Sequence, residues 1–123
     1  MSPSYTYNAT VVRVVDGDTV LLDVDCGFYV IIRQLCRLAG INAIEHNKPG
    51  GPEATAHLLG LLPVGLVVVM RSTGVDKYAG RFDALLTLPD GRDVCAQMVA
   101  DGYAAVWNGK GPRPVPPWPV PVH

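Results

Sequence analysis

The chain lacks a long apolar run, although 49% of its 123 residues are hydrophobic. Its longest apolar stretch, residues 58–70, is interrupted by Pro63 and Gly65. A membrane-spanning helix needs about 20 consecutive apolar residues, so the sequence predicts no membrane segment. The first residues also lack the basic and apolar regions of a signal peptide. We therefore expect a cytoplasmic protein, and its small size suits a bacterial or phage origin.

Paired cysteines and an excess of one charge are also absent. Cys26, Cys36 and Cys95 are odd in number and widely separated, which argues against a zinc site or a dithiol redox motif. We expect three reduced, mostly buried thiols. The net charge of −1 and the pI near 6.2 argue against a protein that coats nucleic acid through charge alone. This net charge remains compatible with an enzyme that binds one phosphate group through a few local side chains. We expect the protein to be a monomer.

Apolar residues and turn residues alternate in the pattern of short strands. The sequence predicts strands at 5–15, 20–25, 28–39, 66–72 and 82–88, and helices at 52–62 and 94–101. Pro52 suits a first helical position, and Asp93 can cap the second helix before Gly102 ends it. This order predicts a mainly β, α+β protein with two or three helices and a five-stranded OB-fold barrel.

Proline dominates the end of the chain. We expect residues 1–111 to form the barrel domain and residues 112–123 to form a proline-rich tail, with prolines at 112, 114, 116, 117, 119 and 121. Such a segment cannot pair as a strand and favours an extended polyproline conformation. Trp118 either packs back on the barrel or offers a protein partner a proline–aromatic ligand.

Three polar clusters interrupt the apolar pattern: D-G-D-T at 16–19, R-L-A-G-I-N-A-I-E at 37–45, and D-K-Y-A-G-R at 76–81. A tight turn at 26–27 would place Asp18 opposite about Leu35, and Asp16 opposite about Arg37. The start of the second strand should therefore lie beside the end of the third.

Residues just past that third strand can complete an acidic corner. Asn42 and Glu45 can fold back toward Asp18, and the crowded oxygens would favour a bound Ca²⁺ or Mg²⁺ beside Arg37. Each residue alone has a simpler interpretation. D-G-D-T can be a turn with local hydrogen bonds, Arg37 can pair with Asp16, and Glu45 can be a solvated loop acid.

In their order along the chain, these segments resemble the staphylococcal-nuclease (thermonuclease) family. The resemblance covers about residues 10–107, through V-D-G-D-T, R-L-A-G-I-x-A-x-E, G-P-E-A, D-K-Y-x-G-R and G-R-D-V…M-V-A-D-G-Y-A. Each run is weak alone, and the ordered set carries the resemblance. It implies a Ca²⁺-dependent endonuclease on an OB-fold barrel, which hydrolyses DNA or RNA to products with a 3′-phosphate.

The resemblance also implies a role for individual residues. The implied metal ligands are Asp18, Asn42 and the backbone carbonyl of Ala43. The implied catalytic residues are Glu45, which would position or deprotonate the attacking water, and Arg37 and Arg81, which would hold the phosphate. The implied substrate contacts are Lys77, Tyr78 and Trp107. Divalent cations, carboxylates and guanidinium forks suit these tasks, and Mg²⁺ or Mn²⁺ could replace Ca²⁺.

Two departures from the family pattern motivate other functions. Asn42 stands where the family has Asp, and a neutral amide should bind a cation less tightly. Ala79 is an extra residue between Tyr78 and Gly80, and an insertion re-aims the side chains that follow unless a bulge absorbs it. One alternative is a weakened or inactive module that binds nucleic acid or protein. The prolines of the tail suggest a further alternative, a peptide or protein adaptor that uses residues 112–123.

Overall fold

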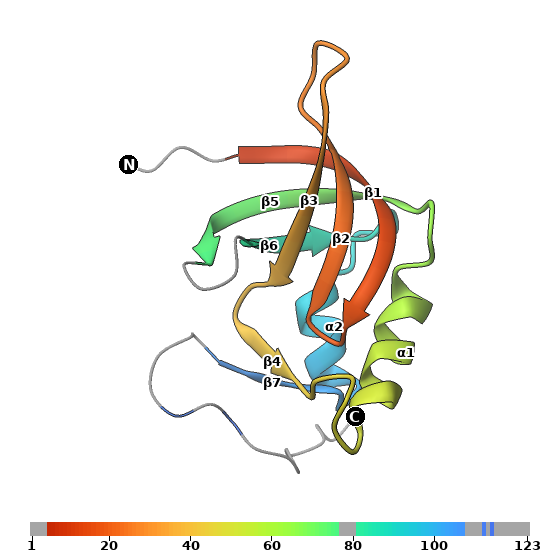
Figure 1. Ribbon diagram of the computed structural model, residues 1–123, viewed down its shortest axis with the longest axis vertical. Coiled ribbons are helices and arrows are strands. Elements are labelled where there is room, and N and C mark those ends of the chain that lie inside the picture. Colours follow the sequence, from red (N-terminus) through yellow and green to blue (C-terminus); the bar gives the residue numbers. More distant parts are fainter. Residues whose placement is uncertain (1–4, 77–80, 108–111, 113, 115–123) are drawn as a thin grey trace.

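The computed structural model describes residues 5–76, 81–107, 112 and 114. In chain order, its elements are β1 (Tyr5–Asp16), β2 (Thr19–Asp25), β3 (Ile31–Leu38), β4 (Ile41–Ala43), α1 (Gly51–Leu61), β5 (Val67–Asp76), β6 (Arg81–Thr87), α2 (Val94–Ala100) and β7 (Ala104–Val106). Five strands close into a barrel in the order β1-β2-β3-β6-β5, and β4 pairs with β7 below it (Figure 1). This confirms the predicted mainly β fold with an OB-like barrel.

The barrel is closed by the long strand β1 and by a short pairing of β3 with β6, which we call the β3–β6 seam. β1 pairs antiparallel with both β2 and β5, and two register irregularities, at Val11/Arg13 and Val14/Asp16, let it bend between them. β3 and β6 pair in parallel through three residue pairs only, Cys36–Phe82 to Leu38–Ala84. The strand that ends at Leu38 therefore lies beside the strand that begins at Arg81.

The core lies inside the barrel and continues down to both helices. Val20 and Leu22 on β2 and Cys36 on β3 are fully buried, as are Leu58 on α1 and Met98 on α2. Burying one such aliphatic side chain stabilises the fold by about 1.5–3 kcal/mol. The apolar alternation along β2 thus fixes which face of the strand points inward.

Both helices follow the sequence signals at their ends. Pro52 lies in the first turn of α1, and the Asp93 carboxylate accepts a hydrogen bond from the Ala96 amide at the start of α2. Gly102 adopts φ 85° just beyond α2, a conformation that glycine adopts without strain. No helix within the described residues is long and apolar enough to cross a bilayer.

The predicted turn at Cys26 and Gly27 is wrong in length. The loop runs over residues 26–30, so β3 begins at Ile31 rather than at Phe28, and Asp25 pairs with Ile31. Phe28 and Tyr29 both have positive φ, which removes them from a strand.

The longer loop also shifts the predicted register. Arg37 pairs with Thr19, and the Leu38 amide donates to the Asp18 carbonyl at 2.7 Å, so neither Leu35 nor Asp16 is where the prediction placed it. The coarser expectation is confirmed, because the start of β2 does lie beside the end of β3.

The two shortest strands were not predicted. β4 and β7 have three residues each and pair from Ile41–Val106 to Ala43–Ala104. Three residues are too few for an alternating pattern to stand out in a sequence. β5 also continues to Asp76, four residues beyond its predicted end.

Burial separates the three cysteines into two kinds. It raises the pKa of the Cys36 thiol to about 11 and that of the Cys95 thiol to about 12, whereas Cys26 is only half-buried. Because the thiolate is the reactive form, a chromogenic aromatic disulfide at about pH 8 should titrate Cys26 faster than Cys36 and Cys95 in the native protein. All three cysteines should react after denaturation. Rapid native labelling of Cys36 or Cys95, located by peptide mapping, would contradict this burial.

Candidate functional site

Asp18 lies immediately before β2, and its side chain connects the turn between β1 and β2 to β4. Its Oδ2 accepts a hydrogen bond from the Ala43 amide at 3.0 Å, and its Oδ1 accepts one from the Thr19 hydroxyl at 3.1 Å. The residue is only 9% exposed. A carboxylate so far from water needs such donors, and these two also fix its orientation.

Arg37 lies next to this carboxylate at the end of β3. Its Nη2 donates to the Ile41 carbonyl at 2.8 Å and lies 3.8 Å from Asp18 Oδ2. The guanidinium carbon also lies 5.5 Å from the centre of the Trp107 ring, a cation–π contact. The predicted pairing of Arg37 with Asp16 is wrong, because Arg37 lies beside Asp18 whereas the Asp16 carboxylate contacts His46.

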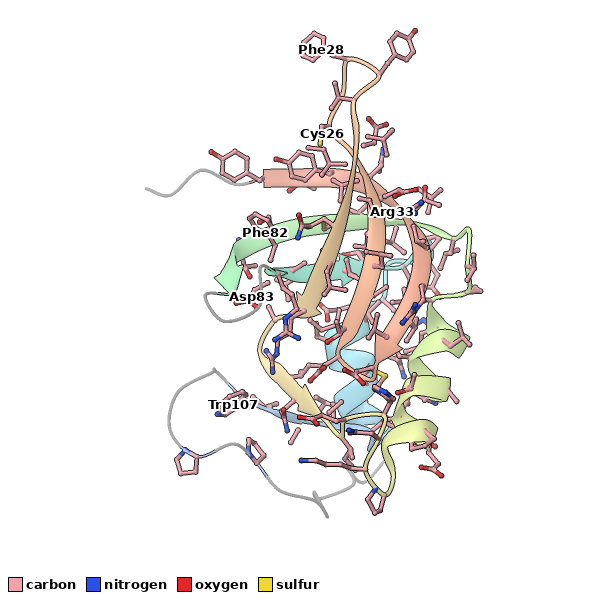
Figure 2. The ribbon with its side chains drawn as sticks, in the orientation of Figure 1. Cys26, Phe28, Arg33, Phe82, Asp83 and Trp107 are labelled. Atoms are coloured by element: carbon pink, nitrogen blue, oxygen red, sulfur yellow. The ribbon has the colours of Figure 1, made fainter. Side chains whose placement is uncertain are left out.

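Arg81 reaches the same face of the barrel through the β3–β6 seam. In the register of the β3–β6 pairing, Asp83 lies opposite Arg37, and Arg81 lies two residues before Asp83. Side chains alternate along a strand, and Cys36 and Ala84 on these strands are fully buried, so Arg37, Arg81 and Asp83 share the outer face. Figure 2 shows Asp83 and Trp107 on one side of the molecule.

Asp83 was missed by the sequence analysis. The only available signal was its position two residues after Arg81, at the start of the predicted strand at 82–88, because residues two apart share one face if the strand extends back to Arg81. Its pairing with Arg37 depends on how the barrel closes, and no local pattern reveals that.

Glu45 lies in the loop that follows β4, with 47% of its side chain exposed. Its carboxylate lies 3.9 Å from the Lys48 ammonium. The next residue, His46, donates its backbone amide to Asp16 at 3.0 Å, and its ring nitrogen lies 2.6 Å from the same carboxylate. The two acids of D-G-D-T thus each bind a backbone amide of the segment 43–46, Asp18 at its start and Asp16 at its end.

Two glycines allow this segment to approach its neighbours closely. A Cβ on Gly51 would overlap the carbonyl oxygen of Glu45, and one on Gly17 would lie 2.9 Å from the Cβ atoms of Ala43 and Ala54. Gly17 is therefore required by packing rather than by an unusual backbone angle. Gly51 sets how closely α1 begins to the Glu45 loop.

The predicted metal ligands partly fit a divalent cation. Asp18 and Asn42 offer oxygen donors of the kind that Ca²⁺ prefers, and each oxygen of Asp18 keeps a lone pair beyond its present hydrogen bond. Asn42 is 5% exposed, and its amide nitrogen donates to the Pro114 carbonyl at 3.4 Å, which leaves its oxygen as an acceptor. Within the described ranges, no group of three or more His, Cys, Asp or Glu side chains could hold a metal. One carboxylate beside the Arg37 guanidinium should bind such an ion weakly.

Three predicted features lie outside the described residues: Lys77, Tyr78 and the inserted Ala79. The predicted tail falls there as well, apart from residues 112 and 114. Trp107 is described. Its amide donates to the Gly40 carbonyl at 2.9 Å, and one face of its ring lies against Arg37.

Comparison with models of known protein families, and with curated proteins, returns no match for this chain. What the site does is therefore inferred from its own geometry.

Two glycines of α1 offer a matched test of the close approach at Glu45. Gly51→Ala should lower the free energy of unfolding by about 1–3 kcal/mol, because the new methyl group would displace the Glu45 carbonyl. Gly60→Ala meets nothing within 4 Å and should raise it by about 0.5–1 kcal/mol, because alanine favours a helix. Urea unfolding measures both changes, and equal effects of the two substitutions would contradict the packing at Gly51.

Proposed function

We propose that the protein is a metal-dependent nuclease that hydrolyses phosphodiester bonds of DNA or RNA. One observation carries the proposal: a carboxylate and a guanidinium, each with 12% of its side chain exposed, lie 3.8 Å apart and are both held by further contacts. Asp18 and Arg37 are thereby oriented before any substrate binds. Such preorganised charge, partly shielded from water, suits the stabilisation of a phosphoryl transition state.

Arg37 is the residue best placed to bind the scissile phosphate. Its hydrogen bond to Ile41 and its contact with Trp107 restrict the guanidinium, so little side-chain freedom would be lost on binding. A guanidinium fork pairs with two phosphate oxygens, and Arg81 on the same outer face would add a second positive charge. Lys77 and Tyr78 remain predicted substrate contacts.

Glu45 would orient the attacking water or accept its proton. The half-exposed carboxylate is accessible to water, and the bonds between His46 and Asp16 fix the backbone next to it. When bound, a Ca²⁺, Mg²⁺ or Mn²⁺ ion would neutralise phosphate charge and activate water. Asp18, Asn42 and the Ala43 carbonyl would hold that ion.

A second candidate function is a non-catalytic barrel that binds nucleic acid or protein. Asn42 supports it, because this neutral side chain lies where a second carboxylate would strengthen cation binding. The 3.9 Å contact of the Lys48 ammonium with Glu45 supports it too, because the carboxylate proposed to bind the attacking water already has an ion-pair partner.

Substitutions at Arg37 and Glu45 test the nuclease proposal. Arg37→Ala should slow cleavage of a labelled oligonucleotide by about 10²–10³-fold, since it removes transition-state charge stabilisation. Glu45→Gln should slow it by about 10²–10⁴-fold, since it removes the proton acceptor. Initial rates with Ca²⁺, Mg²⁺ and Mn²⁺ measure both effects.

Two control substitutions make the same changes of side chain at positions outside the candidate site. Arg33→Ala removes an exposed β3 arginine that pairs with Asp23, and Glu53→Gln neutralises an exposed acid on α1. Both controls should keep the wild-type rate. If the wild type cleaves with none of the three metals yet binds single strands, the non-catalytic alternative replaces the nuclease.

Asn42→Asp tests the metal site directly. A second carboxylate beside Asp18 should lower the melting temperature without metal through like-charge repulsion, and should increase the rise in melting temperature that Ca²⁺ produces. Cleavage should accelerate by about tenfold if ion binding limits the rate. Thermal unfolding with EDTA and with Ca²⁺ measures the shift. Asn8→Asp, on the exposed part of β1, is the matched control, and equal Ca²⁺ responses of the two variants would argue against an ion at Asn42.

A further inference from the structure

The tip of the β2–β3 hairpin presents apolar side chains to solvent. Figure 1 shows this hairpin projecting beyond the rest of the barrel, and Figure 2 places Phe28 at its tip. The relative exposures of Phe28 and Tyr29 are 97% and 105%, and those of Val30, Ile31 and Ile32 lie between 48% and 57%. Five consecutive apolar residues are thus exposed at the end of this hairpin, and apolar surface concentrated in one place typically marks an interaction site.

The backbone at the tip is also unfavourable for the residues that occupy it. Phe28 and Tyr29 have φ values of 54° and 61°, and the Val30 amide donates to the Gly27 carbonyl to close the turn. Successive positive φ values define a mirror-image hairpin turn, which favours Asn-Gly rather than two aromatic residues. The rings contribute nothing to the core of their own chain, so a contact outside this chain is the better explanation for them.

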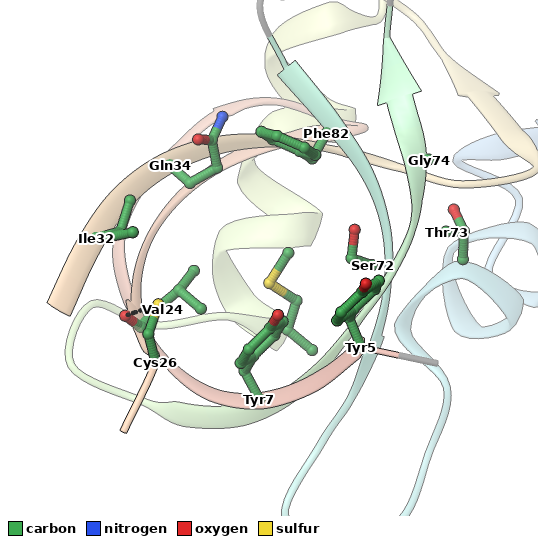
Figure 3. Close-up of a pocket in the computed structure, with 11 residues that line it drawn as sticks. Tyr5, Tyr7, Val24, Cys26, Ile32, Gln34, Ser72, Thr73, Gly74 and Phe82 are labelled. Atoms are coloured by element: carbon green, nitrogen blue, oxygen red, sulfur yellow. Dashed lines mark hydrogen bonds between the residues drawn. The ribbon is translucent and has the colours of Figure 1, made fainter. Parts of the chain in front are cut away.

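An apolar cavity opens at the same end of the barrel. It has a volume of about 550 Å³, and Figure 3 looks into it. Its walls include Tyr5, Tyr7, Val24, Ile32, Met70 and Phe82. This volume lies within the usual range of ligand pockets and can admit aromatic side chains. We call this cavity the barrel mouth.

Charge near the tip argues against nucleic acid or an anionic membrane as its partner. In the hairpin segment 23–33 the charged residues are Asp23, Asp25 and Arg33. Arg33 donates to both oxygens of Asp23, at 2.8 and 3.1 Å, and Asp25 accepts from the Gly27 amide. The segment therefore keeps a net negative charge, whereas phosphate groups attract free cations. An uncharged, aromatic-lined site is the complementary partner.

We propose that the aromatic tip of one copy inserts into the barrel mouth of a second copy, and that the second copy does the same in return. Cys26 and Ile32 line the mouth at the base of the hairpin, so Phe28 and Tyr29 reach about 7–10 Å beyond it at the rise of a strand. Two barrels that meet end to end can therefore exchange tips. Such a reciprocal pair has two-fold symmetry and closes on itself.

The surface available is sufficient for a stable pair. Each aromatic ring buries about 150–250 Å² when enclosed, and both copies contribute two rings. With the mouth surface that they cover, the total reaches about 1,600 Å², the size of a standard protein interface. This dimer differs from the monomer that the sequence predicts.

The dimer goes beyond the proposed nuclease activity and is independent of it. Thr19 pairs with Arg37 at one end of the β2–β3 ladder, and Asp25 pairs with Ile31 at the other. The tip and the candidate site thus lie at opposite ends of the same two strands. A tip substitution should leave any cleavage activity unchanged.

The test replaces the tip in the full chain by the residues that its backbone favours. Phe28→Asn combined with Tyr29→Gly should fit the turn without strain and remove both rings. In sedimentation equilibrium at about 10–200 µM, an interface of this size should make the wild type a dimer and the double variant a monomer. Val64→Asn, an exposed apolar residue outside the tip and the mouth, should leave the dimer intact.

A second variant tests the mouth. Ser72→Trp should fill the cavity and give a monomer, with circular dichroism to confirm that it is folded. A mixture of this variant with the tip variant should contain a weaker heterodimer, because one tip and one mouth remain complementary. A monomeric wild type over the whole range, or a tip variant that still dimerises, would overturn the proposal. Tip-dependent binding of the monomer to neutral lipid vesicles or to an oligonucleotide would overturn it too, and would assign the tip to that partner.

Discussion

One buried carboxylate connects the barrel to the loop that carries the candidate catalytic acid. Asp18 binds the Ala43 amide through its side chain and the Leu38 amide through its carbonyl, so β2, β3 and β4 meet at one residue. Hydrogen bonds to a charged acceptor contribute about 1.5–3 kcal/mol each, more than neutral ones. The same charge that organises the backbone here also lies beside Arg37. A substitution of Asp18 would therefore disturb the backbone contacts together with the proposed metal site.

The fold could be predicted from the sequence wherever a local pattern decides it. Alternation along β2 identifies its buried face, and Asp93 identifies the start of α2 because capping acts within three residues. The register of β2 and β3 could not be predicted, because it depends on a five-residue loop. That loop has Phe28 and Tyr29 at positive φ, and neither residue signals such a conformation. β4 and β7 are defined by each other, so neither can be recognised alone.

For the candidate site, the sequence suggests which residues take part more readily than it suggests which of them are in contact. The family resemblance assigns Asp18, Arg37 and Ala43 to one site, and in the structure Asp18 contacts both the Ala43 amide and the Arg37 guanidinium. The contact of Arg37 with the Trp107 ring could not be predicted, because it joins the end of β3 to the residue that follows β7. The position of Asp83 opposite Arg37 depends on barrel closure in the same way. Long-range pairing leaves little trace in a local pattern, and these contacts are all long-range.

The shortness of the β3–β6 pairing has a consequence for motion. Three parallel residue pairs close the barrel there, whereas β2 and β3 share seven antiparallel ones. Parallel pairs are slightly weaker per residue, and the least supported part of a structure opens first in local fluctuations. Arg37 and Arg81 belong to the two strands that would separate. The distance between the two guanidinium groups therefore depends on the shortest strand pairing of the barrel. Transient opening of this pairing would change that distance, and with it the fit of any anion bound by both groups.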